Sequence, residues 1–508
     1  MRRTHERGQV VILVVLALSL FILGGIGLAI DAAHLYSHRQ MAQAAADAAA
    51  EAAIMSSFNG TNTGPNAFGT SPFDCTPATD VRTPCVYARY NGFGWDSSDT
   101  VSVDFPASAA GVSLSSEDSP AMVGVTIRRN IDTTLMRFVG ADALAAVAAR
   151  GVAAILDVLS PIPIIVLHPT MSESFYINGN PTIQICGGPN RSIQVNSESK
   201  TSIGIDGLAN IVDLSKAGPK NWTGPNSCNG TGADFGDFGG PGSYPGMLAT
   251  GVDGAYLQPA SPIQDPLIGV LAPAVPPDAP APVDVTGGTS GCPLPPTENC
   301  KLYSKGSYPT GIIIKNEFAL FQPGLYYLQG GGFHGRANGE AHMASPCDTP
   351  LEPVFGCGMV VYNAGTDVDD DIFELTSNSG QYKGVAYSYT FPDGTPCTGN
   401  CLMGAQDAGI YKGILFFQDR TKYPREHNLQ GGGGLVLRGT IYLTATEATM
   451  RANPANYQWL SLQGTPGSTT RIIGMIIVDR LELSGNATIV MTLDPFRTLK
   501  IRQVALVR

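Results

Sequence analysis

The N-terminal part of the chain is a long apolar run. Residues 10–30 carry no charge over their whole length. At about 1.5 Å of rise per residue, a helix of this length spans roughly 31 Å, which is the thickness of the hydrocarbon core of a bilayer. The core of a cleaved signal peptide is shorter, and Ala29-Ile30-Asp31 is a poor cleavage site. The pattern therefore predicts an uncleaved transmembrane helix.

The charges that flank this run predict its orientation. Arg2, Arg3 and Arg7 precede it, and Asp31 follows it. Positive charge next to a membrane span is retained on the cytoplasmic side. We therefore expect a cytoplasmic N-terminus and an exported remainder of the chain.

The helix is predicted to continue beyond the membrane. Residues 31–57 contain neither glycine nor proline and are rich in alanine, the strongest helix former. Gln40, Gln43, Asp47 and Glu51 recur on one side of such a helix. A seam of small residues lies on another side: Ala42, Ala45, Ala46, Ala49, Ala52 and Ala53. This seam predicts close packing, either on a sheet of the same domain or on a partner helix.

A small α/β domain is predicted to follow. Residues 58–100 are rich in Gly, Asn, Thr and Pro, which indicates loops. Alternation of apolar and polar residues predicts strands at 101–105 and 122–128. A short helix is expected over 131–139, whereas 143–156 is compatible with either a helix or a strand.

From about residue 160 the pattern changes to short apolar runs separated by Gly, Asn and Pro. This rhythm is compatible with a sandwich, a barrel or a solenoid, and the lack of helical spacers favours a parallel β-helix. Residues 258–300 are rich in proline and predict a strap or linker. In the apolar run 472–478, alternation predicts that Ile473, Met475 and Ile477 point inward. Its other members, Ile472, Ile476 and Val478, are then expected to be covered by the strap or a loop.

Composition limits the function classes. The chain has 508 residues, of which 60 are Gly and 37 are Pro, and charged residues make up 14%. This composition suits a turn-rich β protein better than a helical bundle. The formal net charge of −11 gives no attraction for phosphate backbones, so no nucleic-acid partner is expected.

Cysteine usage agrees with export. All ten cysteines follow the apolar run and form neighbouring couples: Cys75 and Cys85, Cys186 and Cys228, Cys292 and Cys300, Cys347 and Cys357, Cys397 and Cys401. Pairing within each couple is the simplest disulfide framework, and disulfides need an oxidising compartment. A zinc site is the alternative for the last two couples, together with His334 or His342, although the spacing of Cys347 and Cys357 does not fit it.

One acidic segment is a metal candidate. Asp367, Asp369, Asp370 and Asp371 lie close together, with Glu374 nearby. Carboxylate oxygens suit Ca²⁺, but the spacing differs from that of an EF-hand, and such a segment is more often a solvated turn.

Signatures of catalysis are weak in this sequence. Neither a Gly-x-Ser-x-Gly elbow nor a phosphate-binding loop occurs. A lone Gly330-x-Gly332-x-x-Gly335 is not followed by a helix start, so dinucleotide binding is not expected. A β-helical glycosidase would need two nearby carboxylates. The pairs that we consider are Asp369 with Asp419 and Glu374 with Asp407. The prediction is a protein without catalysis and without a cofactor other than calcium.

The N-terminal motif resembles a known family. Arg7-Gly8-Gln9, the apolar run, Leu28-Ala29-Ile30-Asp31 and Gln43-x3-Asp47 are similar to the TadG-like proteins of tight-adherence (Flp-type) pilus loci. Residues 123–127 and 138–140 also resemble this family. Later segments resemble its β-helical members: 165–167, 194–197, 322–327, 413–418 and 481–486. The chain departs from pilins because Glu6-Arg7-Gly8 lacks their processing order. It also departs from family members with a metal-dependent adhesion site, because His168 stands where the first aspartate would be.

The resemblance implies a transmembrane helix that continues into a small pilin-like α/β domain, followed by a mainly-β, parallel β-helix-like body. It implies a bitopic protein of the bacterial cell envelope that assists assembly or anchoring of the pilus together with other pilus-assembly proteins. The body would lie in the periplasm or outside the cell. Surface adhesion to a glycan or a protein is the alternative. The expected divisions are a cytoplasmic tail (1–9), the membrane helix (10–30), the α/β domain (31–157), a first β-rich part (158–257), the strap (258–300) and a second β-rich part (301–508).

Overall fold

The fold is available as a computed structural model. It describes residues 6–58, 60–108, 114, 119–133, 144–159, 162–206, 211–223, 228–240, 248–285, 292, 300–344, 357–367, 369–376, 400–405, 410–431, 434–464, 469–486, 488–493 and 500–507. The chain divides into two compact units. Unit 1 comprises Met1–Val158 together with Arg502–Arg508, and unit 2 comprises Leu159–Ile501.

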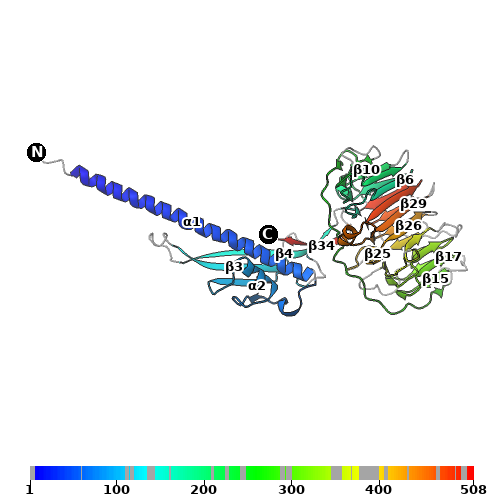
Figure 1. Cartoon of the computed structure of the whole chain (residues 1–508), viewed down its shortest axis with the longest axis horizontal. Coiled ribbons are helices and arrows are strands. Elements are labelled where there is room, and N and C mark those ends of the chain that lie inside the picture. Colours follow the sequence, from blue (N-terminus) through cyan, green and yellow to red (C-terminus); the bar gives the residue numbers. More distant parts are fainter. Residues whose placement is uncertain are drawn as a thin grey trace. The chain divides into compact units, whose positions relative to one another are not determined.

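Unit 1 is built on one long helix. The helix α1 (Glu6–Phe58) has 53 residues, so the predicted continuation of the apolar helix through the alanine-rich stretch is confirmed. Figure 1 shows the second half of α1 lying along a sheet, while its first half extends beyond it. Ala42, Ala46 and Ala49 have no exposed surface and pack against the strands of the sheet. Among the described residues the alanine seam therefore docks on the helix's own unit.

The sheet of unit 1 is antiparallel along β1 (Phe73–Asp74), β2 (Asp99–Asp104), β3 (Met122–Asp132) and β4 (Leu144–Leu159). The ambiguous stretch 143–156 is thus a strand from Leu144 onward. The helix expected over 131–139 is wrong at its start, because β3 continues to Asp132; residues 134–139 lie outside the described ones. The loops expected over 58–100 contain a short 3-10 turn, Gly64–Asn66, and the helix α2 (Thr83–Tyr90). We did not expect α2 because its eight residues are too few for a periodic pattern.

The fifth strand of this sheet comes from the other end of the chain. β34 (Lys500–Leu506) lies next to β4 in the strand order, and the backbone N–H of Val507 donates to the carbonyl of Val152. The prediction that residues 301–508 all belong to the β-rich body is therefore wrong for the last seven residues. Unit 2 is an insertion between two neighbouring strands of unit 1, and no local pattern in the sequence reports such a long-range pairing.

Among the described residues, unit 2 contains three sheets whose neighbouring strands are parallel, except for one antiparallel pair. The 11-stranded sheet is, in order, β12 (Leu248–Ala249), β10 (Ile211–Ala217), β7 (Thr182–Gly187), β33 (Thr488–Leu493), β30 (Thr469–Ile473), β27 (Leu435–Arg438), β24 (Asn400–Met403), β21 (Glu340–Met343), β18 (Phe318–Phe321), β15 (Cys300–Tyr303) and β14 (Val283–Asp284). The 10-stranded sheet is β13 (Tyr256–Leu257), β11 (Asp234–Asp237), β8 (Arg191–Val195), β5 (Ile164–Val166), β31 (Ile476–Val478), β28 (Thr440–Leu443), β25 (Ile414–Gln418), β22 (Met359–Asn363), β19 (Gly324–Leu328) and β16 (Gly306–Tyr308). The 8-stranded sheet is β17 (Ile312–Lys315), β20 (Phe333–Arg336), β23 (Phe373–Leu375), β26 (Arg425–Gly431), β29 (Gln458–Gly464), β32 (Arg480–Gly485), β6 (Phe175–Gly179) and β9 (Ile203–Asp206).

The first three strands of unit 2, β5, β6 and β7, lie in the interior of the three sheets rather than at their edges. From β15 to β30 each strand pairs with the third strand after it, so successive strands pass from sheet to sheet. The next three strands, β31, β32 and β33, then pair with β5, β6 and β7 from the start of the unit. In Figure 1 the orange and red strands accordingly lie between green ones. The predicted mainly-β body with parallel strands is confirmed.

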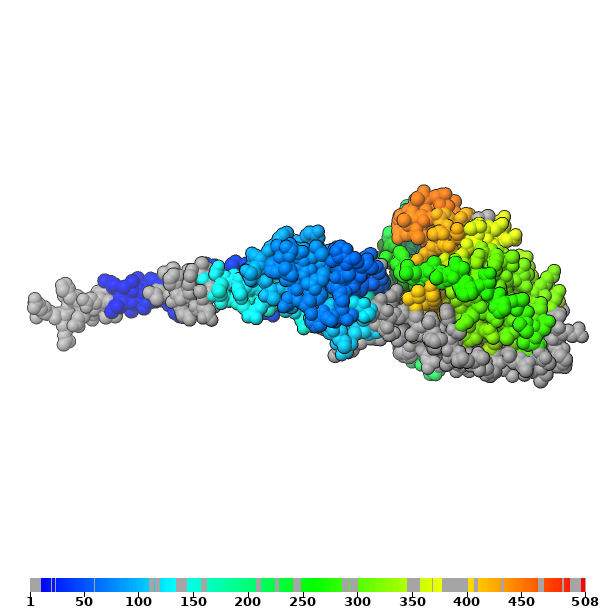
Figure 2. Space-filling view, turned by 90° about the horizontal axis from the view of Figure 1, so that it is seen from below, coloured from blue at the N-terminus to red at the C-terminus, as the bar shows by residue number. Residues whose placement is uncertain are grey.

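Two apolar layers hold unit 2 together. The first lies between the three sheets and includes Phe175, Phe333 and Phe416. The second lies on the outer side of the 10-stranded sheet, where Leu267 and Val270 of the proline-rich segment pack on strand residues such as Tyr442 and Ile477. Residues 263–271 therefore form a strap over this sheet, whereas β14 further along the same proline-rich stretch belongs to the 11-stranded sheet. Figure 2 shows green parts of unit 2 on the surface.

Polar contacts fasten the strap. The side chain of Asn196 both donates to the carbonyl of Ile263 and accepts its N–H. Asp265 accepts from the Tyr442 hydroxyl at 2.6 Å, and the Arg420 guanidinium donates to the carbonyls of Leu267 and Ile268.

The predicted facing of the run 472–478 is wrong except at Ile473, which packs against the core between the sheets. Ile472, Ile476 and Val478 point into the core between the sheets, whereas Met475 and Ile477 lie beneath the strap. Alternation is present, but both faces of the strand are apolar because one of them carries the strap. The sequence pattern could not distinguish the core face from the strapped face.

Candidate functional site

The apolar part of α1 is exposed in unit 1. Val11, Phe21 and Ile30 are among its side chains with about half or more of their surface accessible. Among the described helices, α1 is the one that is long and apolar enough to cross a membrane. Exposure of so many apolar side chains is unfavourable in free energy in water and favourable in hydrocarbon. This first half of α1 is therefore a candidate membrane anchor.

The docked part of α1 approaches its sheet very closely. The side chain of Gln43 donates to the carbonyl of Arg150 at 2.8 Å. At the neighbouring Gly151, an added Cβ would lie 2.5 Å from backbone atoms of Ala46 and Asp47. The close fit explains why this strand carries glycine and alanine opposite the helix.

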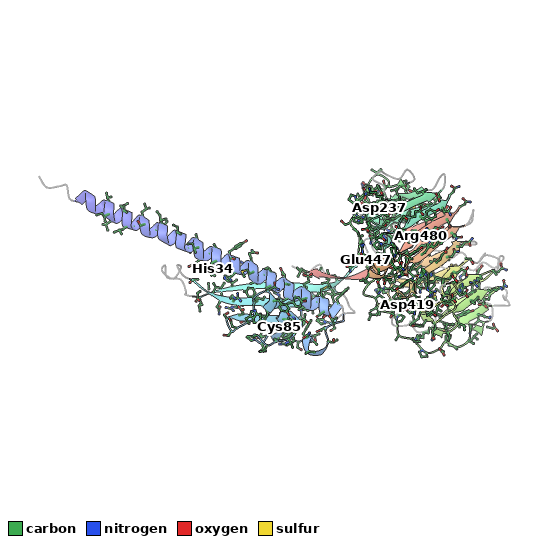
Figure 3. All side chains as sticks on the ribbon, viewed as in Figure 1. His34, Cys85, Asp237, Asp419, Glu447 and Arg480 are labelled. Atoms are coloured by element: carbon green, nitrogen blue, oxygen red, sulfur yellow. A yellow bond between two sulfur atoms is a disulfide. The ribbon has the colours of Figure 1, made fainter. Side chains whose placement is uncertain are left out.

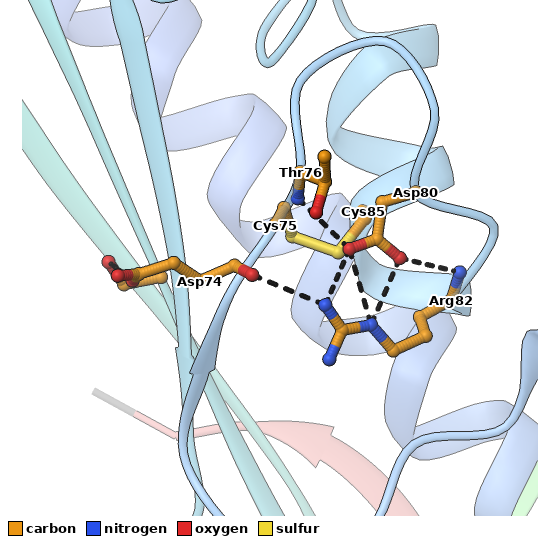
Figure 4. Close-up of a disulfide and its surroundings, with 7 residues drawn as sticks. Asp74, Cys75, Thr76, Asp80, Arg82 and Cys85 are labelled. Atoms are coloured by element: carbon orange, nitrogen blue, oxygen red, sulfur yellow. Dashed lines mark hydrogen bonds and ion pairs between the residues drawn. A yellow bond between two sulfur atoms is a disulfide. The ribbon is translucent and has the colours of Figure 1, made fainter.

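The disulfide Cys75–Cys85 links the residue that follows β1 to α2, with a Cα–Cα distance of 5.6 Å (Figure 4). Beside it, Asp80 accepts hydrogen bonds from the side chain of Arg82 and from the backbone N–H of Thr76. Burial alone would raise the pKa of Asp80, but these hydrogen bonds, above all those of Arg82, lower it to about 2. Cys75, Asp80 and Cys85 have the spacing of a metal cluster, yet both sulfurs are bonded to each other and the carboxylate is paired. The group is therefore structural.

Two more disulfides are described, Cys186–Cys228 and Cys292–Cys300. Cys357 and Cys401 are also disulfide-bonded. Their expected couple partners, Cys347 and Cys397, lie outside the described residues. Because Cys357 and Cys401 are not thiolates, they are unavailable for the zinc site considered as an alternative.

We predict that peptide mapping without reduction recovers five disulfides between neighbouring cysteines, including Cys347–Cys357 and Cys397–Cys401. Each short loop closed in this way restricts the unfolded chain, which stabilises the fold by about 2–3 kcal/mol. Free thiols, or a bridge between distant couples such as Cys75 with Cys401, would contradict the framework.

The acidic segment forms a turn with an internal counter-ion. The Asp367 carboxylate accepts the N–H groups of Asp369 and Asp370, which lowers its pKa. Asp371 is buried and accepts the N–H of Gly331. The buried guanidinium of Arg425 donates to the carbonyls of Asp367 and Asp371. This cation occupies carbonyls that a Ca²⁺ ion would use, and calcium binding at the four aspartates stays a prediction.

Two histidines considered for zinc are paired with carboxylates instead. The Nδ1 atom of His334 lies 2.7 Å from Glu374, and the Nε2 atom of His342 lies 3.2 Å from Glu340. Although burial raises the pKa of Glu374, hydrogen bonds from Arg336 and His334 hold it below its usual value. Of the carboxylate pairs considered for catalysis, Asp407 lies outside the described residues, and Asp419 accepts hydrogen bonds from Thr421.

Two further sequence candidates have local structural roles. Gly332 precedes the strand β20 rather than a helix, so Gly330-x-Gly332-x-x-Gly335 is a turn between strands. His168 is fully buried, its Nδ1 atom accepts the N–H of Met171, and its Nε2 atom lies 3.0 Å from the carbonyl of Pro454. Burial lowers the pKa of His168.

The outer face of the 8-stranded sheet presents aligned polar side chains. Alternate residues such as Leu460 and Leu481 point into the core, so the residues between them point outward. Three outward rows follow from the strand register. The first is Glu426, Trp459 and Arg480; the second is Ile313, His334, Glu374, Asn428, Ser461, Glu482 and Tyr176; the third is Lys315, Arg336, Gln430, Gln463, Ser484, Asn178 and Asp206.

Trp459 and Arg480 form the centre of this face. The guanidinium carbon of Arg480 lies 4.3 Å from the Trp459 ring centroid and 5.7 Å from that of Tyr176. The Nη2 atom of Arg480, which is labelled in Figure 3, also lies 3.9 Å from the Oε2 atom of Glu482. Burial, together with the nearby Glu426, raises the pKa of Glu482.

Three buried polar atoms at this centre have no hydrogen-bond partner among the described residues. They are Nε1 of Trp459, Nε of Arg480 and Oδ1 of Asn428. Sequence reasoning did not single out these residues. The available signal was the related endings of three strands, His427-Asn-Leu-Gln-Gly431, Leu460-Ser-Leu-Gln-Gly464 and Leu481-Glu-Leu-Ser-Gly485, which align in register.

Comparison with protein families decides the nature of the N-terminal segment. Residues 8–56 match the family model described as "Putative Flp pilus-assembly TadE/G-like". The chain carries a TadE/G-like Flp pilus-assembly domain at its N-terminus. The matched residues lie within α1, and the match confirms the resemblance of the N-terminal motif. The resemblance of the later segments to β-helical members stays a prediction.

Beyond the TadE/G-like segment, the comparisons add little. No curated protein matches the chain. Among solved structures, the crystal structure of the competence-associated pilin ComZ from Thermus thermophilus matches with 11% identity, covering 81% of this chain and 84% of that chain. The TM-score of 0.22 is too low for this likeness to carry an argument.

Proposed function

We propose that this chain is a single-pass membrane protein that assists the assembly or anchoring of a tight-adherence pilus without performing catalysis. The observation that carries the proposal is the TadE/G-like match over residues 8–56, which falls on a helix with a membrane-length apolar segment. In this proposal residues 10–30 span the cytoplasmic membrane and Arg7 lies on the cytoplasmic side. The part of unit 1 that follows residue 30, and the whole of unit 2, then lie in the periplasm or outside the cell.

We also infer that unit 2 is a parallel β-helix. The support is the pairing of each strand from β15 to β30 with the third strand after it, in three largely parallel sheets. Each turn of such a coil buries its inward side chains only against its neighbours, so it provides a rigid body with several faces. A rigid body of this kind suits a structural role in the envelope.

The topology can be tested directly. Protease added to spheroplasts is expected to digest unit 2 and the part of unit 1 that follows residue 30, because the basic N-terminal flank keeps only the short tail inside. Immunoblots against tags at the two ends measure the outcome. Protection of the large units from protease would contradict the orientation.

The pilus role is tested in the native host. Deletion of the coding region is expected to abolish or reduce surface pili in electron micrographs, and the wild-type chain is expected to restore them. A Leu16→Arg chain should fail to restore them, because a charge at the centre of a span costs about 3 kcal/mol. A Tyr36→Ser chain, altered at an exposed position of α1 outside the apolar run, is the control. Normal pili in the deletion strain would overturn the role.

A second candidate function is adhesion through unit 2. The observation that favours it is the outer face of the 8-stranded sheet, which combines aromatic, amide and charged side chains. Such mixed faces are typical of binding surfaces rather than of structural packing surfaces.

A further inference from the structure

We propose that the outer face of the 8-stranded sheet binds an uncharged polysaccharide chain, centred on Trp459. The inference deepens adhesion, the second candidate function, and does not depend on the pilus role. The residues that would contact the ligand are Trp459, Arg480, Asn428, Glu482 and Tyr176.

The charge of this face indicates an uncharged ligand. Its outward rows contain the basic residues Lys315, Arg336 and Arg480 and the acidic residues Asp206, Glu374, Glu426 and Glu482. Most of these charges are partnered: Arg336 with Glu374, and Arg480 near Glu482. A nucleic acid or an acidic polymer needs an excess of positive charge, which is absent from these rows.

The aromatic centre provides a stacking surface. A sugar ring presents C–H groups that pack on the face of an indole, as a cation does. In the structure that face of Trp459 is covered by the guanidinium of Arg480 at 4.3 Å. Arg480 has a flexible side chain, so a sugar ring can take its place by turning the guanidinium outward.

The unpaired atoms provide hydrogen-bonding capacity. The indole N–H of Trp459 and Nε of Arg480 are donors, and Oδ1 of Asn428 is an acceptor. Buried polar groups without partners are rare in native proteins and cost about 1–3 kcal/mol each, so three of them on the neighbouring strands β26, β29 and β32 call for a partner. Hydroxyl groups donate and accept, and a sugar can satisfy all three.

The geometry of the sheet favours an extended chain over a folded or strand-like partner. The backbone groups of the central strands β26, β29 and β32 are used in pairing within the sheet, so an added peptide strand has nothing to pair with there. Along each row, successive side chains are about 4.7–4.9 Å apart because they lie on neighbouring strands. This spacing is close to the length of one pyranose unit. A linear glycan can therefore meet similar groups on successive strands.

The test uses the full chain in micelles of a polyoxyethylene detergent, since a detergent with a sugar headgroup would compete. The probes are maltohexaose, cellohexaose and chitohexaose, with an alginate hexamer as the acidic comparison. The chain has three tryptophans, so a Trp95→Phe/Trp222→Phe chain reports Trp459 alone by its fluorescence. At least one uncharged probe is expected to give a saturable change in emission.

Substitutions identify the site by calorimetric titration of the same probe. Trp459→Ala is expected to weaken binding about tenfold and Asn428→Ala about threefold, whereas Trp95→Ala, at an exposed tryptophan of unit 1, leaves it unchanged. Circular dichroism checks folding, and Asn428→Ala decides the question if Trp459→Ala does not fold. Equal affinity in wild type and both variants overturns the proposal. A response to alginate alone, or to no uncharged probe, overturns it as well and leaves an acidic polymer or a protein as the occupant.

Discussion

Replacing Gly151 by alanine is expected to detach the docked part of α1 from the sheet of unit 1. The new Cβ would lie 2.5 Å from the carbonyl carbon of Ala46 and from the backbone nitrogen of Asp47. These are helix backbone atoms, so no side-chain rotation can relieve the contact, and α1 must move away from β4. Overpacking of this kind costs about 3 kcal/mol or more. Faster hydrogen exchange over Ala42–Ile54 in the full chain, together with a lower unfolding midpoint, would measure the effect.

Gly124→Ala is the matched control. This glycine lies on the neighbouring strand β3, opposite Val152, and its Cβ would meet the ends of the Asp104 and Arg150 side chains. Those side chains form a largely exposed ion pair, which is worth little and can rearrange. We expect a loss below about 1 kcal/mol. Similar losses for both substitutions would contradict the close helix contact at Gly151.

The second large effect concerns Asp479, a fully buried carboxyl group at a corner of unit 2. It lies 2.5 Å from the hydroxyl of Thr444 and accepts the N–H groups of Ala445 and Gln458. In this way Asp479 connects the two ends of the loop that contains α3 (Glu447–Ala452), since this loop runs from Ala445 to Gln458. Burial raises the pKa of Asp479 to about 7.

The sign of the pH effect follows from the raised pKa. Between about pH 4 and pH 7 the folded chain holds a proton on Asp479 that the unfolded chain releases, so stability falls as the pH rises through this window. The rise in the pKa of Asp479 from 3.8 to about 7 corresponds to a loss of about 4 kcal/mol in the free energy of unfolding across this window, at 1.36 kcal/mol per pH unit. The protonated oxygen can donate to Thr444 while the other oxygen accepts the two N–H groups.

Two variants separate ionisation from hydrogen bonding. Asp479→Asn keeps an acceptor for Ala445 and Gln458 and a donor for Thr444, so it is expected to be more stable than wild type at pH 8 and similar to it at pH 5. Asp479→Ala leaves these groups unpaired and should lose about 3–5 kcal/mol at both pH values. Urea unfolding of the three chains at the two pH values measures this. Parallel pH profiles for wild type and Asp479→Asn would contradict the assignment.

Several features of the fold were predictable because their causes are local. The membrane-length run and the helix that continues from it depend on the composition of adjacent residues, and α1 follows both. The alanine seam predicted a close-packed face, and Ala46 is fully buried. The alternation of short apolar runs with glycine and asparagine predicted the parallel β body. Neighbouring cysteines such as Cys75 and Cys85 are joined because their loop is short.

Other features depend on residues that are distant in the sequence. The run 472–478 is apolar on both sides, and the position of the strap decides that Ile477 faces it rather than the core. From the sequence alone, the acidic turn at Asp367 is a candidate ion site. In the structure, Arg425, which lies 58 residues later, supplies the opposite charge. The face around Trp459 arises because β26, β29 and β32 stack in register, which no single strand reveals.

The sequence by itself therefore determined the membrane-length apolar run, the long helix and the strand rhythm, since each depends on contacts within one or two turns of chain. Only the tertiary structure decided that β34 returns to the sheet of unit 1, which side of each apolar strand is the core, and which polar side chains gather around Trp459. Periodicity shows that a strand has two faces. Which segment covers each face depends on residues that lie tens or hundreds of positions away in the sequence, because these contacts form only when the strands have stacked into sheets.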